Sequence, residues 1–185
     1  ESKGYSEINL NIGCPSEKVI KGEFGACLMN SPNLVAECVS EIKNSCSLPI
    51  SIKTRLGLGY EEDLTLLFEL IDKTKAAGCY KYFIHARNAI LSGLSPKGNR
   101  NIPPLIYEFV KNIKNEFPNI KFILNGGIDS LNKASKLSKE YDGVMLGRLI
   151  QNNPFCLSKV DKLFYMEPDR KIVNEKLILE YFEYI

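Results

Sequence analysis

The sequence lacks the residue pattern of a zinc site. It has one histidine, His85, and no two of its six cysteines are separated by two residues. Structural zinc sites use closely spaced cysteines and histidines, so we expect no metal. The irregular cysteine spacing predicts free thiols in a reducing compartment rather than a disulfide framework.

Long hydrophobic runs and a strong charge of one sign are also missing. No apolar run approaches the roughly 20 residues of a membrane span, and the start does not resemble a secretory signal. The chain begins with Glu1 rather than Met, so we expect the native N-terminus to lie upstream. We expect a cytoplasmic protein, with an organelle left open. The 24 basic and 22 acidic side chains give a net charge of +2, too balanced to indicate nucleic-acid binding without a local basic patch.

What is present is the composition of a soluble globular domain. The 185 residues are 44% hydrophobic and 25% charged, and the chain is long enough for a sizeable core. Apolar, β-branched runs alternate with amphipathic runs, which predicts a parallel sheet covered by helices. We expect strands over 7–12, 49–54, 81–86, 121–126 and 143–147. We expect helices from Pro32 with Ser31 as its N-cap, over 61–77, over 104–116, after Ser130, and from about 154 with a break at Pro168.

The strand ends favour a barrel over an open doubly wound sheet. Polar or special residues follow all five strands, whereas an open sheet uses mainly the ends beside its switch point. A full (β/α)₈ TIM barrel has eight strands and about 250 residues. We therefore expect a barrel fragment with about five of the eight strands over residues 1–154, followed by a helical tail over 155–185.

Several of these strand ends carry candidate functional groups. Cys14 lies on a turn made rigid by Gly13 and Pro15, which suits a reactive group, although a plain buried thiol stays open. We expect the other cysteines to be packing or incidental, with Cys38 on the apolar face of its helix. Lys53 lies at a strand end, where it is either a cation beside a cofactor or a lysine whose stem packs on the sheet while its ammonium reaches solvent.

The ends of the last two strands are rich in glycine. The segments 125–128 (NGGI) and 147–148 (GR) fit a phosphate site, because backbone N–H groups and Arg148 favour an anion there. Two ordinary turns with a surface arginine are the alternative.

Together these motifs resemble the flavin-dependent tRNA-dihydrouridine synthases. Two segments, GACLM and LSPKGNRNIPPL, most resemble the subfamily that acts on D-loop uridines 20 and 20a. The matching segments are NLNIGCPS (9–16), GACLM (25–29), IKTRLG (52–57), IHAR (84–87), LSPKGNRNIPPL (94–105), NGGI (125–128) and GVMLGR (143–148).

The resemblance implies a barrel that holds FMN and reduces the C5–C6 double bond of uridine in tRNA. It also implies that NADPH reduces the flavin. It implies that Cys14 is the proton donor, a role open to thiols in general because a free thiol, with a reference pKa of about 8.5, keeps its proton at neutral pH. It places FMN at Lys53, His85, Asn125, Gly126, Gly127, Gly147 and Arg148. It places tRNA contacts at Asn11, Lys97 and Arg100.

Two alternatives stay open beside this function. One is an FMN barrel that acts on a free pyrimidine, and the other is a non-catalytic tRNA-binding fragment. Because three strands of the resembled barrel are missing, we expect these 185 residues alone to bind FMN poorly or not at all. We also expect self-association that covers the exposed sheet edges, and we expect 155–185 to begin a helical tRNA-binding domain.

Overall fold

The computed structural model describes residues 3–168 and 174–184. They form two compact units, of which the first comprises Glu1–Gly127 and Leu137–Met145. The second unit comprises Ile128–Lys136 and Leu146–Ile185. The sheet and most of the predicted site lie in the first unit.

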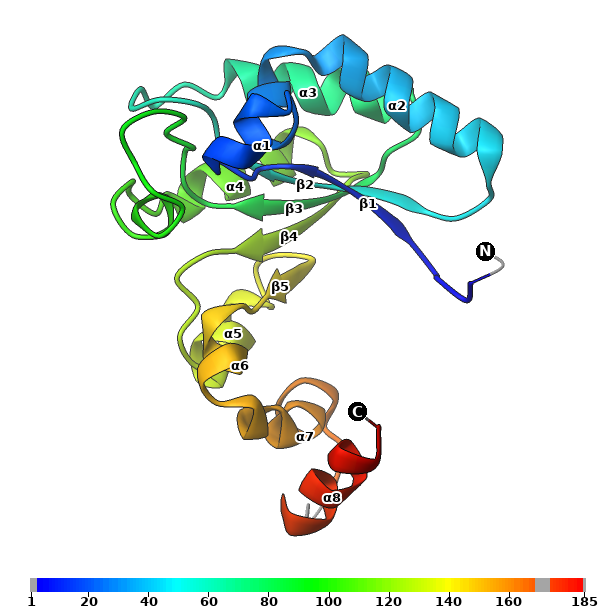
Figure 1. Cartoon of the computed structure of the whole chain (residues 1–185), viewed down its shortest axis with the longest axis vertical. Coiled ribbons are helices and arrows are strands. Elements are labelled where there is room, and N and C mark those ends of the chain that lie inside the picture. The colour runs from blue at the N-terminus through cyan, green and yellow to red at the C-terminus, as the bar shows by residue number, and fades with distance from the viewer. Residues whose placement is uncertain (1–2, 169–173, 185) are drawn as a thin grey trace. The chain divides into compact units, whose positions relative to one another are not determined.

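The first unit contains a five-stranded parallel sheet whose strand order follows the chain (Figure 1). A doubly wound sheet reverses its order at a switch point, whereas sequential parallel strands are the arrangement of a β/α barrel. The fold is therefore part of a TIM barrel, and the expected strands are confirmed to within two residues at each end. They are β1 (Ile8–Ile12), β2 (Ile50–Arg55), β3 (Lys81–His85), β4 (Lys121–Asn125) and β5 (Gly143–Met145).

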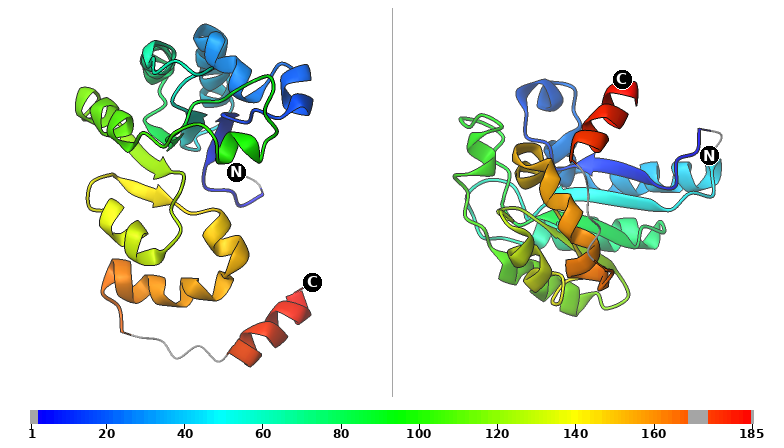
Figure 2. Two further views of the ribbon diagram at one scale, coloured as in Figure 1. Left: turned by 90° about the vertical axis from the view of Figure 1, so that its left-hand side faces the viewer. Right: turned by 90° about the horizontal axis from the view of Figure 1, so that it is seen from below.

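The long helices of the first unit lie on one side of the sheet (Figure 1). They are α2 (Pro32–Ser45), α3 (Thr65–Ala76) and α4 (Tyr107–Glu116). Shorter helices occur in the loops after β1 and β3, at the carboxyl ends of the strands. These are α1 (Glu17–Lys21), η1 (Gly25–Asn30) and η2 (Gly98–Arg100). The left view of Figure 2 looks onto this carboxyl edge.

Two helices begin later than their sequence pattern predicts. The helix expected from 61 begins at Thr65, because the Asp63 carboxylate accepts the Thr65 backbone N–H at 2.8 Å and forms a turn just before the N-cap residue, Leu64. The helix expected from 104 begins at Tyr107, because the Ile106 N–H donates to the Ala86 carbonyl at 2.9 Å. That bond keeps the preceding residues against the end of β3.

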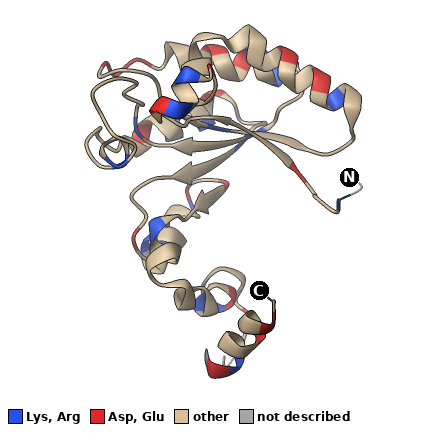
Figure 3. Ribbon diagram, viewed as in Figure 1, with Lys and Arg blue, Asp and Glu red and all other residues tan. Residues whose placement is uncertain are grey.

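Helix α2 begins at Pro32 with Ser31 as its N-cap, as predicted, but one expectation for it is wrong. The Ser31 carbonyl accepts the Val35 N–H at 3.2 Å, while its hydroxyl makes no capping hydrogen bond. The wrong expectation concerns Cys38, whose side chain is exposed rather than packed. The buried stripe of α2 consists of Pro32, Val35 and Val39, and Cys38 faces away from it. Red and blue segments in Figure 3 mark the charged residues along α2 and α3.

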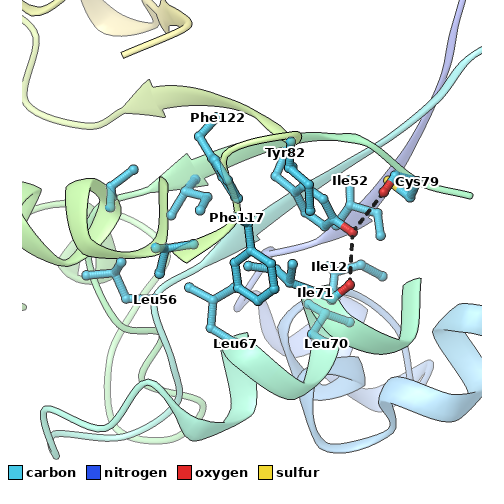
Figure 4. Close-up of a cluster of buried hydrophobic side chains, with 14 of the residues drawn as sticks. Ile12, Ile52, Leu56, Leu67, Leu70, Ile71, Cys79, Tyr82, Phe117 and Phe122 are labelled. Carbon is cyan, nitrogen blue, oxygen red and sulfur yellow. Dashed lines mark hydrogen bonds between the residues drawn. The ribbon is translucent and has the colours of Figure 1, made fainter. Parts of the chain in front are cut away.

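The core lies between the sheet and these helices (Figure 4). Tyr82 and Phe122 on the neighbouring strands β3 and β4 are fully buried, with ring centroids 5.8 Å apart. The Tyr82 hydroxyl lies 2.6 Å from the Thr74 hydroxyl on α3, so the polar end of this ring has a partner inside the core. Burial raises the pKa of Tyr82, which keeps the phenol neutral.

The opposite face of the sheet carries no helix of the first unit in its described part (Figure 1). At the amino ends of the strands, this face holds a polar network. The Lys81 ammonium is 2.6 Å from one Glu7 carboxylate oxygen, and Ser51 donates to the other. Asn9 donates to the Ser51 hydroxyl at 2.8 Å, so the network joins β1, β2 and β3.

We expect Glu7→Gln to cost roughly 0.5–1 kcal/mol of unfolding free energy at pH 7, because the pair is partly exposed. Burial acts to raise the pKa of Glu7, but hydrogen bonds from Lys81 and Ser51 outweigh it and hold the pKa below its ordinary value of 4.5. The ionised pair therefore stabilises the fold above that value. Its contribution is lost as the pH falls through the folded-state pKa.

Urea unfolding of both proteins across this pH range measures the difference. Glu37→Gln, at an exposed position on α2, is the control and should cost less at every pH. A constant difference between wild type and Glu7→Gln down to the lowest pH would contradict the role of the ion pair.

The second unit is helical. Its segments are most of α5 (Leu131–Leu137), α6 (Arg148–Asn152), η3 (Pro154–Lys159), α7 (Val160–Tyr165) and α8 (Asn174–Tyr184). The Ser130 hydroxyl accepts the Lys133 N–H at 3.3 Å, which confirms Ser130 as a cap, and α7 ends before Pro168. None of the helices described has the length and apolar character that crossing a membrane requires.

Candidate active site

Strand register places four predicted site residues on the helix-free face of the sheet. Asn11 pairs with Lys53 across β1 and β2, and His85 pairs with Asn125 across β3 and β4. Arg55, two residues beyond Lys53, pairs with His85. Because side chains alternate along a strand, these residues share one face near the carboxyl ends of the strands. A barrel enzyme builds its active site from this end.

Cys14 lies directly after β1 on a turn over residues 13–16, which we call the thiol turn. The Gly13 N–H donates to the Asn11 side-chain oxygen at 3.1 Å, so Asn11 fixes the start of the turn. The Cys14 carbonyl accepts the Ala26 N–H at 2.9 Å, and the Cys14 thiol lies 3.4 Å from the Ser16 hydroxyl. The half-buried thiol is therefore held from both sides of the turn.

Gly25 allows the chain to return against this turn. Its φ is +73°, and an added Cβ would lie 2.5 Å from the Cys14 carbonyl oxygen. That contact is with backbone and cannot be relieved by a side-chain rotation. A glycine at this position is therefore required by the placement of Cys14 as well as by its own conformation.

We expect Gly25→Ala to destabilise the fold by about 2–4 kcal/mol, combining the left-handed backbone cost with the backbone contact. Gly59→Ala is the matched control, because Gly59 has a φ of +78° with no atom within 4 Å of an added Cβ. The control should cost only about 1–2 kcal/mol. Urea unfolding measures both, and equal losses would show that Gly25 does not press on the thiol turn.

Lys53 brings a half-buried cation to the same face. Burial lowers the pKa of its ammonium, the charge of Arg55 lowers it further, and the nearby Cys14 acts in the opposite direction. Lys53 is thus within electrostatic reach of the thiol. Among residues 3–168 and 174–184, its ammonium makes no hydrogen bond or ion pair. A desolvated cation without a protein partner is suited to an anionic or electron-rich ligand.

His85 and the glycines after β4 form one packed group. His85 is 8% exposed, and an added Cβ on Gly126 would lie 2.5 Å from its ring carbon Cδ2. Gly126 has a φ of +113°, and its carbonyl accepts the Tyr107 hydroxyl at 2.6 Å. Asn125 donates to the Met145 carbonyl at 2.8 Å. The bare glycine backbone therefore lets the imidazole lie directly against the turn.

The predicted phosphate residues fall in both units. Asn125 is the last residue of β4, and Gly126 and Gly127 follow it within the first unit. Gly147 and Arg148 belong to the second unit, where both are exposed and Arg148 is the first residue of α6.

The loop over residues 87–104, which we call the basic loop, follows β3 and holds three cations and no acid. Lys97 and Arg100 are exposed beside and on η2, where Figure 3 shows blue on this loop. Asn99 between them is fully buried. Its side chain accepts the Ile90 N–H at 2.7 Å and donates to the Ile90 carbonyl at 2.9 Å. The loop is thus anchored from inside while its cations face solvent.

Arg55 is the central residue that sequence reasoning missed. It is 4% exposed, and its guanidinium donates to carbonyls of Gly13, Asn88 and Asn99. Burial and the nearby Arg87 lower the pKa of Arg55 to about 10, with Cys14 acting in the opposite direction. The alternation of IKTR, which puts Arg55 on the face of Lys53, is the signal that could have identified it. Asn99, also missed, carries no comparable signal.

The fold and the placement of these residues define the class: part of a β/α barrel with a candidate active site at the carboxyl ends of its strands. Residues 1–183 match the model of the family described as dihydrouridine synthase (Dus), and the chain belongs to this family.

Proteins similar to this chain carry the name tRNA-dihydrouridine(20/20a) synthase. One from Shewanella oneidensis is 44% identical over 183 residues, which are 99% of this chain and 55% of the relative. One from Pasteurella multocida is 44% identical over 180 residues, or 97% of this chain and 55% of the relative. One from Salmonella typhimurium is 47% identical over 163 residues, or 88% of this chain and 49% of the relative. The chain spans about half the length of the curated relatives it matches.

Proposed function

We propose that this chain carries the catalytic part of a tRNA-dihydrouridine synthase that acts on D-loop uridines 20 and 20a, with FMN as cofactor and NADPH as reductant. The observation that carries the proposal is the placement of the Cys14 thiol, the Lys53 ammonium and the His85 imidazole at one edge of the sheet. The family and the names of the relatives support the substrate class.

The residues present fit a flavin. Among the described residues, the half-buried ammonium of Lys53 makes no hydrogen bond or ion pair, and His85 and Asn125 lie on the same face of the sheet. Gly126 and Gly127 carry no side chain of their own after β4, where His85 packs against Gly126 and Leu105 packs against both glycines. In the first unit, Lys53, His85, Asn125, Gly126 and Gly127 would hold the FMN. For Gly147 and Arg148, which belong to the second unit, the FMN contact remains what the family resemblance implies. When bound, FMN supplies the hydride that the C5–C6 double bond of uridine accepts.

The protein supplies the second hydrogen as a proton. Cys14 donates its thiol proton to C5 of the uridine, because negative charge develops there and on the O4 carbonyl as C6 is reduced. The thiol turn restricts the direction of the S–H bond, and a misplacement of about 1 Å would cost a large part of the rate. Lys53 places a fixed positive charge near the thiol, where it stabilises negative charge that develops during the reaction.

The basic loop favours tRNA over a free pyrimidine as the substrate. Lys97 and Arg100 are exposed at the edge where Cys14 lies, and cations on such a loop contact phosphates. A free pyrimidine has no phosphate for them to bind. Uridines in RNA loops can also leave their stack and enter a site at modest cost. Asn11, which fixes the thiol turn, is the third residue proposed to contact the tRNA.

The remaining parts of the enzyme are proposals as well. The other strands of the barrel would complete the flavin site, so residues 1–185 alone should bind FMN weakly and self-associate through the helix-free face. We further propose that residues 155–185 begin a helical tRNA-binding domain.

The test compares substrates in the full-length protein. Purified protein with FMN and NADPH is given unmodified tRNA, free uridine or free uracil, and the products are analysed by nucleoside mass spectrometry. We expect dihydrouridine in tRNA and little or no reduction of the free compounds. Faster reduction of a free pyrimidine would favour the second candidate, and tRNA binding without any reduction would favour a non-catalytic binding module.

A further inference from the structure

One buried guanidinium joins the thiol turn to the basic loop. Arg55 Nε donates to the Gly13 carbonyl at 3.3 Å, next to Cys14. Its NH1 group donates to the Asn99 carbonyl at 2.9 Å and to the Asn88 carbonyl at 3.2 Å. Two segments that are more than 70 residues apart in the sequence are therefore held by one side chain.

Stability alone does not account for an arginine here. Within the described residues, Arg55 has no carboxylate partner, and Arg87 and Arg100 lie close enough to oppose its charge. Burying a cation without a counterion is costly. A planar guanidinium can donate in several fixed directions at once, which a lysine ammonium at this site cannot reproduce. The arrangement uses the property that distinguishes arginine from other cations.

Asn99 links Arg55 to the outer part of the basic loop. Its carbonyl accepts from Arg55 while its side chain pairs with the backbone of Ile90. Lys97 and Arg100 are near neighbours of Asn99 in the chain and face solvent. A shift of the Arg55 guanidinium would thus move the thiol turn and the two exposed cations relative to each other.

We propose that Arg55 is a positioning residue, which holds the thiol turn and the basic loop in one fixed arrangement so that a tRNA bound by the loop presents its uridine to Cys14. The proposal rests on the proposed function and adds a residue that touches neither the substrate nor the reacting atoms. If Arg55 has this role, replacing its guanidinium should make the thiol turn and the basic loop lose order together.

Hydrogen–deuterium exchange of the full-length protein tests this directly. Arg55→Lys keeps the charge and removes the fork, and we expect amide exchange over 13–16 and over 88–100 to rise about tenfold in both segments. Exchange over 122–124 in the core of β4 should not change. In the activity assay, the same variant should raise KM for tRNA and lower kcat, each by about tenfold.

Two further variants make the result decisive. Lys81→Gln is the matched control, because it removes a cation from the same sheet face at the opposite ends of the strands. It should leave exchange in both segments unchanged. Asn99→Ala removes side-chain bonds that lie only within the basic loop, yet it should raise exchange over 13–16 as well, because the Asn99 carbonyl moves away from Arg55.

Two results would overturn the proposal. One is unchanged exchange in Arg55→Lys, and the other is a rise confined to one of the two segments in both Arg55→Lys and Asn99→Ala. The exchange readout needs neither tRNA nor cofactor. A coupled rise in a protein that forms no dihydrouridine would therefore refute the proposed function and leave the positioning role intact.

Discussion

Cys14→Ala should lower dihydrouridine formation by the full-length protein by about 100- to 10,000-fold, the range expected when a general acid is removed. Within the thiol turn, two side chains can donate a proton, the Cys14 thiol and the Ser16 hydroxyl that accepts a hydrogen bond from it. Of these two, the thiol is the one that interacts electrostatically with Lys53. Affinity for tRNA should stay within about threefold, since the exposed cations of the basic loop are untouched. Rates come from nucleoside mass spectrometry and affinities from filter binding.

Cys27→Ala is the matched control for this prediction. Cys27 lies in the same glycine-rich stretch, and its thiol donates to the Phe24 carbonyl at 3.1 Å. Its loss should change turnover by less than about threefold, because that bond is exposed and of modest strength. Comparable losses in the two variants would mean that the segment tolerates no change. Full turnover in Cys14→Ala would remove Cys14 from the reaction.

Phe122→Ala should lower the free energy of unfolding by about 3–5 kcal/mol, the largest stability effect that we expect. Phe122 is fully buried on β4 and stacks on Tyr82 at an interplanar angle of 24° (Figure 4). Removing its ring would leave a cavity between the sheet and the helices. Urea unfolding followed by circular dichroism measures the loss.

Phe24→Ala provides the comparison for the core. Phe24 is 53% exposed in the loop before η1, so its replacement should cost less than about 1 kcal/mol. If the two phenylalanines cost the same, the packing of β3 and β4 against the helices would not be the source of stability described above.

The strands could be predicted from sequence because each is a short apolar run between turn residues, and the barrel arrangement followed from polar residues at every strand end. Helix starts were less predictable, since they depend on single contacts. The Asp63 carboxylate delays α3, and the bond from Ile106 to Ala86 delays α4. Cys38 has the helical spacing of a buried residue, but burial depends on what packs beside it.

The candidate site was also predictable only in part from the sequence. The positions of Lys53, His85 and Asn125 at strand ends could be predicted from the sequence, and the strand register places them on one face of the sheet. Their FMN-binding role was implied by the family resemblance and stays a prediction. Arg55 and Asn99 could not be assigned their roles, because the acceptors of Arg55 are backbone carbonyls of distant residues. Carbonyl groups are present at every residue, so a sequence pattern does not single them out.

The most direct test of the account is whether tRNA covers the thiol of Cys14. The full-length protein is treated with iodoacetamide with and without unmodified tRNA, and alkylation of each cysteine is followed by mass spectrometry. Exposed Cys38 on α2 serves as the internal reference. We predict that tRNA slows alkylation of Cys14 about tenfold or more and leaves Cys38 unchanged. Equal rates at Cys14 with and without saturating tRNA would contradict a uridine site at this edge of the sheet.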